Sequence, residues 1–169
     1  MTGVLLVGGA STRFGSPKAL ARLDGTTLAE RAWRTLGDAC DERLAVGKTA
    51  DGLPLPFPVL DDGTAVRAPL AGVVAGLRAA RHDVCILLPV DCPLISAGAL
   101  RRLAAAAPAH PQTGPLPGAY PRSLLPELEW KLERGDYSLR DVEASIVELD
   151  PDELANINTE ADLRRVQLL

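Results

Sequence analysis

The chain has 169 residues, of which 47% are hydrophobic and 24% are charged, close to the averages of soluble globular domains. This composition argues against a disordered tail, a collagen-like repeat and a coiled coil, and the length suits about one domain. The net charge is −4, from 18 basic and 22 acidic residues that are mixed along the sequence, so we expect no nucleic-acid partner.

The cysteines and the apolar runs bear on the compartment of the protein. Cys40, Cys85 and Cys92 show no C-x-x-C spacing, which argues against a metal finger and against a disulfide framework. The longest apolar run, residues 84–90, is far shorter than the roughly 20 residues of a membrane span. No charged segment precedes the first apolar run, unlike in a secretory signal. We therefore expect a cytoplasmic protein without membrane contact, and the sequence leaves its oligomeric state open.

The first half of the chain alternates apolar runs with amphipathic segments. Residues 3–7 are apolar and end at two glycines, which predicts a buried strand followed by a loop. Thr27 and Glu30 have the spacing of a capping box, and apolar residues then recur at helical spacing up to Gly37, where we expect the helix to end. The other elements predicted in this half are strands at 43–46 and 57–60 and a helix at 70–80.

The second half continues this alternation. Residues 84–90 form the most hydrophobic run, which predicts a strand buried on both faces. Ser96 is placed to cap a helix that runs to about residue 107. Residues 108–118 are rich in proline and glycine, and we expect an irregular, mobile cover there. The remaining predicted elements are a strand at 116–120, helices at 124–132 and 139–144, a strand at 145–149 and a helix at 159–168.

Strands that alternate with helices are typical of βαβ units. The predicted fold class is therefore α/β, a doubly wound and mostly parallel sheet with helices on both faces. No internal repeat and no long linker divides the sequence, so we expect residues 1–169 to form a single domain.

Polar clusters follow three of the predicted strands directly. They comprise the segment 8–18, the pair Asp61 and Asp62, and Asp91. Open α/β sheets bind ligands outside the carboxyl ends of their strands, where these clusters are expected to lie. The first loop is much longer than the usual 2–6 residues or so, and it combines glycines with hydroxyl groups and with the cations Arg13 and Lys18. Such a loop can wrap phosphate groups with its backbone N–H groups.

The spacing within this loop excludes the two commonest phosphate-binding motifs. A Walker A loop needs lysine directly after its second glycine, but Gly15 is followed by Ser16. A dinucleotide fingerprint needs G-x-G-x-x-G, which Gly8, Gly9 and Gly15 do not supply. The loop therefore predicts neither a P-loop NTPase nor a Rossmann dehydrogenase.

The segment LLVGGASTRFGSPKAL resembles the L-A-G-G-x-S-x-R-[FM]-G-x-x-K signature of molybdenum cofactor guanylyltransferases and their nucleotidyltransferase relatives. Three further segments agree with this family in order and spacing. Residues 68–72, APLAG, are similar to its G-P-L-A-G, and residues 90–95, VDCPLI, to its C-D-x-P-[YFL]-[IL]. Residues 156–163, NINTEADL, are similar to its N-[VIL]-N-T-P-E-[DE]-L. The resemblance spans almost the whole chain and implies the family's Rossmann-like nucleotidyltransferase fold.

The activity implied by the resemblance is transfer of a nucleoside monophosphate from an NTP to a phosphate-bearing acceptor, with release of pyrophosphate. In the named family the donor is GTP and the acceptor is the molybdenum-loaded pterin phosphate, molybdopterin. Mg²⁺ is the implied cofactor. Since the acceptor is already an ionised phosphate, no general base is needed.

The resemblance also implies roles for individual residues. Arg13, Lys18 and Asp91 are the implied catalytic residues, because the two cations would hold the β- and γ-phosphates and the carboxylate would hold Mg²⁺. Asp91 and Asn158 are the implied metal ligands, with Asn156 as a further candidate. Asp61 matches the family's guanine-side aspartate. The implied nucleotide-binding set is Leu6, Val7, Gly8, Gly9, Ser11, Lys18, Asp61 and Asp91.

Several alternatives stay open from the sequence. Gly47 stands where the guanylyltransferases often have asparagine, and Ala68 replaces the first glycine of G-P-L-A-G, so another NTP can be the donor. A cytidylyltransferase for the same cofactor, a transferase for another small acceptor such as a sugar phosphate, and a non-catalytic nucleotide-binding accessory protein are the competing interpretations.

Overall fold

The computed structural model describes residues 1–8 and 14–168. Its main sheet has seven strands within these residues, in the order β5-β4-β1-β6-β8-β7-β9. The strands of this sheet are β1 (Thr2–Leu6), β4 (Glu42–Gly47), β5 (Val59–Asp61), β6 (Val84–Pro89), β7 (Ala109–Pro111), β8 (Gly118–Pro121) and β9 (Ser145–Val147). Of the strands described, β8 alone runs antiparallel to its neighbours β6 and β7, so the prediction of a mostly parallel sheet is confirmed.

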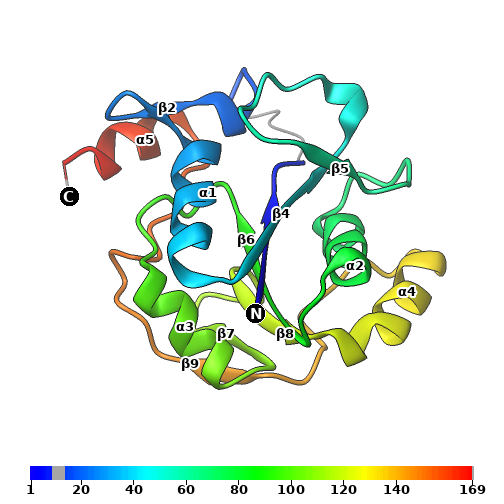
Figure 1. Ribbon diagram of the computed structural model, residues 1–169. Helices are drawn as coiled ribbons and strands as arrows, with labels where there is room; N and C mark the ends of the chain where they lie inside the picture. Colours follow the sequence, from blue (N-terminus) through cyan, green and yellow to red (C-terminus); the bar gives the residue numbers. More distant parts are fainter. Residues whose placement is uncertain (9–13, 169) are drawn as a thin grey trace.

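Helices cover both faces of this sheet. The helices are α1 (Leu28–Ala39), α2 (Pro69–Ala79), α3 (Ala97–Ala105), α4 (Leu125–Glu133) and α5 (Glu160–Val166). Short 3₁₀ turns occur at η1 (Lys18–Leu20), η2 (Thr49–Asp51) and η3 (Arg122–Leu124), and β2 (Arg22–Leu23) pairs with β3 (Thr26–Thr27) in a separate hairpin. Figure 1 shows α1 and α3 on one side of the central strands and α2 and α4 on the other. This is the doubly wound arrangement expected from the sequence.

The central strand β1 contributes to two apolar layers. Leu5 packs in the cluster that includes α1 and α3, whereas Val4 and Leu6 pack in the cluster that includes α2. In β6, Ile86 and Leu87 divide in the same way between the two clusters. Successive side chains of a strand point to opposite faces, so a strand covered on both sides needs apolar residues at every position. This explains the continuous apolar runs in the sequence.

Side-chain caps begin three of the helices, as the sequence predicts at Thr27 and Ser96. The Thr27 hydroxyl accepts a hydrogen bond from the Glu30 N–H at 3.1 Å, and the Glu30 carboxylate accepts one from the Thr27 N–H at 3.1 Å. Ser96 Oγ accepts from the Ala99 N–H at 3.0 Å. At α5 the Thr159 hydroxyl accepts from the Asp162 N–H in the same way. These caps satisfy N–H groups that a helix leaves without internal partners.

The prediction that the first helix ends at Gly37 is wrong, since α1 continues to Ala39. The glycine provides space for a neighbouring side chain: a Cβ atom on Gly37 would lie 2.5 Å from Nη1 of Arg43. That guanidinium donates to the Trp33 carbonyl oxygen at 2.9 Å. Gly37 therefore accommodates a contact between α1 and β4 and does not terminate the helix.

Two expectations for the second half are also wrong. Residues 139–144 form turns instead of a helix, with Leu139 and Val142 buried in the α2-side cluster. Six residues are too few for a helix that lacks a strong packing face, and Lys131 anchors this segment by a hydrogen bond to Asp141 at 2.6 Å. The segment 108–118 is not a mobile cover, because it contains β7, whose buried Ala109 pairs with β8 and β9.

Across residues 1–8 and 14–168, no helix combines the length and the apolar character needed to cross a membrane.

The contact between α2 and β1 predicts a sensitive glycine. A Cβ atom on Gly76 would lie 2.5 Å from Cγ1 of Val4, a stiff β-branched side chain within the central strand. We expect Gly76→Ala to lower the free energy of unfolding by about 1–2 kcal/mol, because overpacking outweighs the gain in helix propensity. Gly98→Ala is the matched control in α3, where a Cβ atom would meet only Ser96 Oγ at 3.5 Å. Urea denaturation measures both variants, and equal stability of the two would contradict this packing.

Candidate functional site

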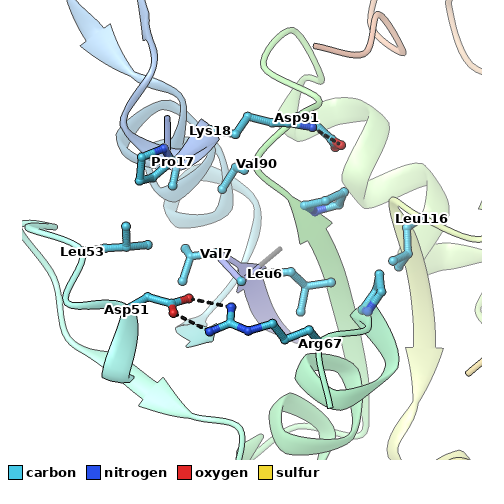
Figure 2. Close-up of a pocket in the computed structure, with 14 residues that line it drawn as sticks. Leu6, Val7, Pro17, Lys18, Asp51, Leu53, Arg67, Val90, Asp91 and Leu116 are labelled. Atoms are coloured by element: carbon cyan, nitrogen blue, oxygen red, sulfur yellow. Dashed lines mark hydrogen bonds and ion pairs between the residues drawn. The ribbon is translucent and has the colours of Figure 1, made fainter. Parts of the chain in front are cut away.

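A cavity within the described residues opens at the carboxyl ends of β1 and β6. It has a volume of about 500 Å³, and we call it the larger chamber. Residues 6–8, which end β1, form one wall, and residues 89–91, which end β6, form another. Its charged lining residues are Lys18, Asp51, Arg67 and Asp91 (Figure 2). Leu6, Val7 and Gly8, which the sequence assigns to nucleotide binding, all line this chamber.

Lys18 connects three distant segments in this chamber. Its Nζ atom donates to Asp91 Oδ2 at 3.4 Å, and Figure 2 shows the two side chains facing each other. Nζ also donates to Asn158 Oδ1 at 2.9 Å. The end of the first loop, the end of β6 and the approach to α5 thus meet at one ammonium group. The convergence of Lys18, Asp91 and Asn158 that the sequence predicts is present in the structure.

The side chain of Asn156 lies against Asp91. The side-chain amide makes its hydrogen bonds when its nitrogen is assigned to the side that faces Asp91. The nitrogen then donates to Asp91 Oδ1 at 3.1 Å and to the Asp91 carbonyl oxygen at 2.9 Å. The Ile157 N–H donates to the same carbonyl oxygen at 2.9 Å. An amide nitrogen is a donor and does not ligate a cation. In this orientation Asn156 is placed to orient Asp91, and its assignment as a further candidate metal ligand stays a prediction.

A second cavity of about 190 Å³, the smaller chamber, adjoins the larger one. Leu6, Gly8, Arg67 and Pro69 line both chambers. Its charged residues besides Arg67 are Lys48 and Asp62, which form an ion pair of 2.6 Å. Sequence reasoning assigned no site role to Lys48, Asp51 or Arg67, and it named Asp62 only as part of the strand-end pair with Asp61. The strand-end rule that identified Asp91 was a usable signal for Lys48, since Lys48 directly follows β4.

Asp61 does not line either chamber. Its carboxylate accepts from the Thr49 N–H at 2.9 Å, the Thr49 hydroxyl at 2.6 Å and the Gly63 N–H at 2.8 Å. These hydrogen bonds, the one from the Thr49 hydroxyl above all, lower the pKa of the Asp61 carboxyl to about 2. Consecutive side chains point in opposite directions at the end of an extended strand, so Asp62 lines the chamber and Asp61 holds the turn. The structure thus replaces the expected guanine-side role of Asp61 with a turn-stabilising one.

A second ion pair links the two sides of the larger chamber. Arg67 Nη2 lies 2.7 Å from Asp51 Oδ1, and Nη1 donates to Asp51 Oδ2 at 3.2 Å (Figure 2). This two-point contact lowers the pKa of the Asp51 carboxyl and raises that of the Arg67 guanidinium. The pair joins η2 to the segment before α2.

Gly9, Ser11 and Arg13 lie outside the residues that the structure describes, so their assignments stay predictions.

The doubly wound sheet, with a cation and a carboxylate meeting beyond two adjacent strands, has the arrangement of open α/β proteins, whose ligand sites lie at the carboxyl edge of the sheet. A family model described as "MobA-like NTP transferase domain" matches residues 3–150. The chain belongs to this family.

Individual relatives agree with the family assignment. The chain is 41% identical to the molybdenum cofactor guanylyltransferase of Burkholderia vietnamiensis, over 65% of this chain but only 58% of that protein. It is 28% identical to the molybdenum cofactor guanylyltransferase of Desulfosudis oleivorans, over 99% of this chain and 94% of that protein. The crystal structure of molybdopterin-guanine dinucleotide biosynthesis protein A from Archaeoglobus fulgidus superposes with a TM-score of 0.80 at 24% identity. That superposition covers 99% of this chain and 97% of the other, and it supports the fold.

The role of Asp61 as a turn residue predicts a pH-dependent contribution to stability. Its pKa of about 2 lies below that of an unfolded aspartate, near 3.9, so the ionised carboxylate stabilises the fold. We expect Asp61→Asn to lower stability at neutral pH, and the difference from the unmodified chain to shrink as the pH falls from about 4 toward 2. Urea denaturation at pH 7, 4 and 3 measures this difference. A difference that stays constant over this range would contradict the assignment.

Proposed function

We propose that the chain transfers GMP from GTP to a phosphate-bearing acceptor, molybdopterin in its molybdenum-loaded form, with release of pyrophosphate. An oxygen of the acceptor phosphate attacks the α-phosphorus of GTP and forms a new P–O bond. The bond from the α-phosphorus to the bridging oxygen breaks, and pyrophosphate takes that electron pair. The contact of Lys18 with both Asp91 and Asn158 carries the proposal, because it brings a cation and two oxygen ligands together at the larger chamber, which Lys18 and Asp91 line.

Lys18 supplies the positive charge that this transfer needs. In this proposal its ammonium group binds phosphate oxygens of GTP and holds the leaving pyrophosphate as negative charge builds on it. A cation that is already positioned in a partly enclosed chamber stabilises such charge more than solvent does. With its side chain 17% exposed, Lys18 is shielded from bulk water on most of its surface. Arg13 is proposed to assist from the first loop.

Asp91 and Asn158 are the proposed Mg²⁺ ligands. Within the described residues no group of three His, Cys, Asp or Glu side chains is arranged to hold a metal ion. Magnesium in phosphate-transfer sites is commonly held by only one or two carboxylates, with phosphates and water completing its shell, so one carboxylate and one amide oxygen fit this mode. Bound there, Mg²⁺ would neutralise charge on the phosphate oxygens. Asn156 donates to Asp91 and so fixes the direction of its carboxylate.

The two chambers suit different parts of the substrates. The smaller chamber has mainly apolar walls and a few polar groups, which is typical of a site for a planar base. The larger chamber holds the residues proposed to bind phosphates and Mg²⁺, and it leaves space for the acceptor. The names of the relatives favour GTP as the donor and a molybdenum cofactor precursor as the acceptor.

Pyrophosphate release in the presence of GTP, Mg²⁺ and molybdenum-loaded molybdopterin tests this proposal. We expect Lys18→Met and Asp91→Asn each to lower the rate by about 100- to 1000-fold, since each removes preorganised charge at the reacting phosphates. Arg78→Met is the control, because Arg78 pairs with Glu129 at the far end of α2 and is expected to leave the rate within about twofold. Tight GTP binding without pyrophosphate release would instead identify a non-catalytic nucleotide-binding protein.

The orienting role of Asn156 gives a separate prediction. Asn156→Ala removes the hydrogen bonds that direct the Asp91 carboxylate, and we expect the affinity for Mn²⁺, measured by electron paramagnetic resonance with GTP present, to fall about 10- to 100-fold. Thermal unfolding of the same variant separates this effect from a structural one. If the melting temperature falls while Mn²⁺ affinity stays unchanged, Asn156 has only a structural role.

A further inference from the structure

The smaller chamber contains an ion pair that is almost fully buried. Lys48 Nζ lies 2.6 Å from Asp62 Oδ1, and the two side chains are only 10% and 6% exposed. Nζ also donates to the carbonyl oxygen of Thr64, and Asp62 Oδ1 also accepts from the Thr64 N–H at 3.2 Å. Removing two charges from water is unfavourable, and their mutual attraction only partly offsets it. The burial of this ion pair therefore does not by itself show that the pair stabilises the fold.

The pair presents a hydrogen-bond donor next to an acceptor. A lysine ammonium has three N–H donors, and two of those of Lys48 go to Asp62 and Thr64 within the described residues. The hydrogen bonds described for the Asp62 carboxylate all use Oδ1. One ammonium N–H and the oxygen Oδ2 are thus the donor and the acceptor that the pair offers to a ligand. Apolar Leu6, Val46 and Val66 line the same chamber.

Two glycines form part of one wall of the chamber. Gly47 ends β4 beside the first loop, and a Cβ atom there would lie 2.8 Å from Cγ2 of Val7 and 3.2 Å from the Gly8 nitrogen. The ends of β1 and β4 therefore pack closely and form a wall without projecting side chains at Gly8 and Gly47. The chamber communicates with the phosphate-binding side through Arg67 and Pro69, which line both cavities.

We propose that Lys48 sets the base selectivity of this chain by donating to the carbonyl oxygen at C6 of a purine, while Asp62, held by Lys48, accepts from the N1–H beside it. This inference rests on the proposed function, because it places the base of the NTP in the smaller chamber. A 6-oxopurine offers an acceptor next to a donor, complementary to the pair. Adenine carries an amino group at C6 and no hydrogen on N1. Its amino group would face the Lys48 ammonium, donor against donor, and its N1 would face the Asp62 carboxylate, acceptor against acceptor. Lys48 thus favours GTP and ITP over ATP.

Four triphosphates separate the contribution of the C6 oxygen from that of the 2-amino group. GTP has both groups, ITP has only the oxygen, 2-aminopurine riboside triphosphate has only the amino group, and ATP has neither. Isothermal titration calorimetry with Mg²⁺ present gives the dissociation constant of each. We expect Lys48→Met to weaken GTP and ITP binding by about 10- to 100-fold, the range for loss of a charge-assisted hydrogen bond, and to change the other two by less than about threefold.

Two further variants guard against a structural explanation. Lys48→Met leaves Asp62 buried without its cation, so the double variant Lys48→Met/Asp62→Asn removes both charges and is expected to show the same loss of preference for GTP and ITP. Lys131→Met is the matched control, since Lys131 is also buried and paired with carboxylates, those of Asp136 and Asp141 in the α4 region. It is expected to leave all ratios between nucleotides unchanged.

The outcomes distinguish this inference from the function it rests on. If Lys48→Met weakens all four nucleotides equally, or none of them, Lys48 only tethers the turn at residues 62–64 and the inference is wrong. If the unmodified chain binds none of the four triphosphates, the proposed function itself fails. Preference of the unmodified chain for ATP over ITP would also overturn the role of Lys48.

Discussion

The contact of the Lys18 ammonium group with Asp91 and Asn158 is the interaction on which the rest of the site depends. It joins residues that lie 73 and 140 positions away in the sequence. β1 and β6 are parallel neighbours, so their carboxyl ends lie side by side at one edge of the sheet. The apolar layers on both faces hold β1 and β6 in register, so the core determines where the charged groups meet. The site is thus a consequence of the sheet topology.

The charged groups of the cleft follow a common arrangement. Asp91 follows β6, Lys48 follows β4 and Asp62 follows β5, so each lies just beyond a strand of the same parallel set. Strands buried on both faces contain apolar residues throughout, so polar side chains can first reach solvent or a ligand at the ends of these strands. Each chamber therefore has its own lysine and aspartate: Lys18 faces Asp91 in the larger chamber, and Lys48 pairs with Asp62 in the smaller one. Arg67 lines both and pairs with Asp51 across the larger one.

Local patterns in the sequence predicted most of the fold. The apolar runs of β1 and β6 and the helix caps at Thr27 and Ser96 act over a few residues, and the structure confirms each of them. The strand-end rule indicated Asp91, and the family resemblance indicated Lys18 and Asn158; the structure brings these three side chains together. Alternation along the strand places the Asp61 and Asp62 side chains on opposite sides, but the sequence alone does not determine which of the two sides faces the cavity. Contacts between residues distant in the sequence determine the remaining features, which local patterns therefore did not predict. These are the pairing of Lys48 with Asp62, the inclusion of β7 in the sheet and the turns at 139–144.

A crystal structure with Mg²⁺ and a non-hydrolysable GTP analogue tests the central claim most directly. The account predicts that phosphate oxygens lie within hydrogen-bond distance of Lys18 Nζ, that the metal ion contacts Asp91 and Asn158, and that the ribose leads into the chamber lined by Lys48. A triphosphate bound away from Lys18, with the metal ion on other residues, would contradict it.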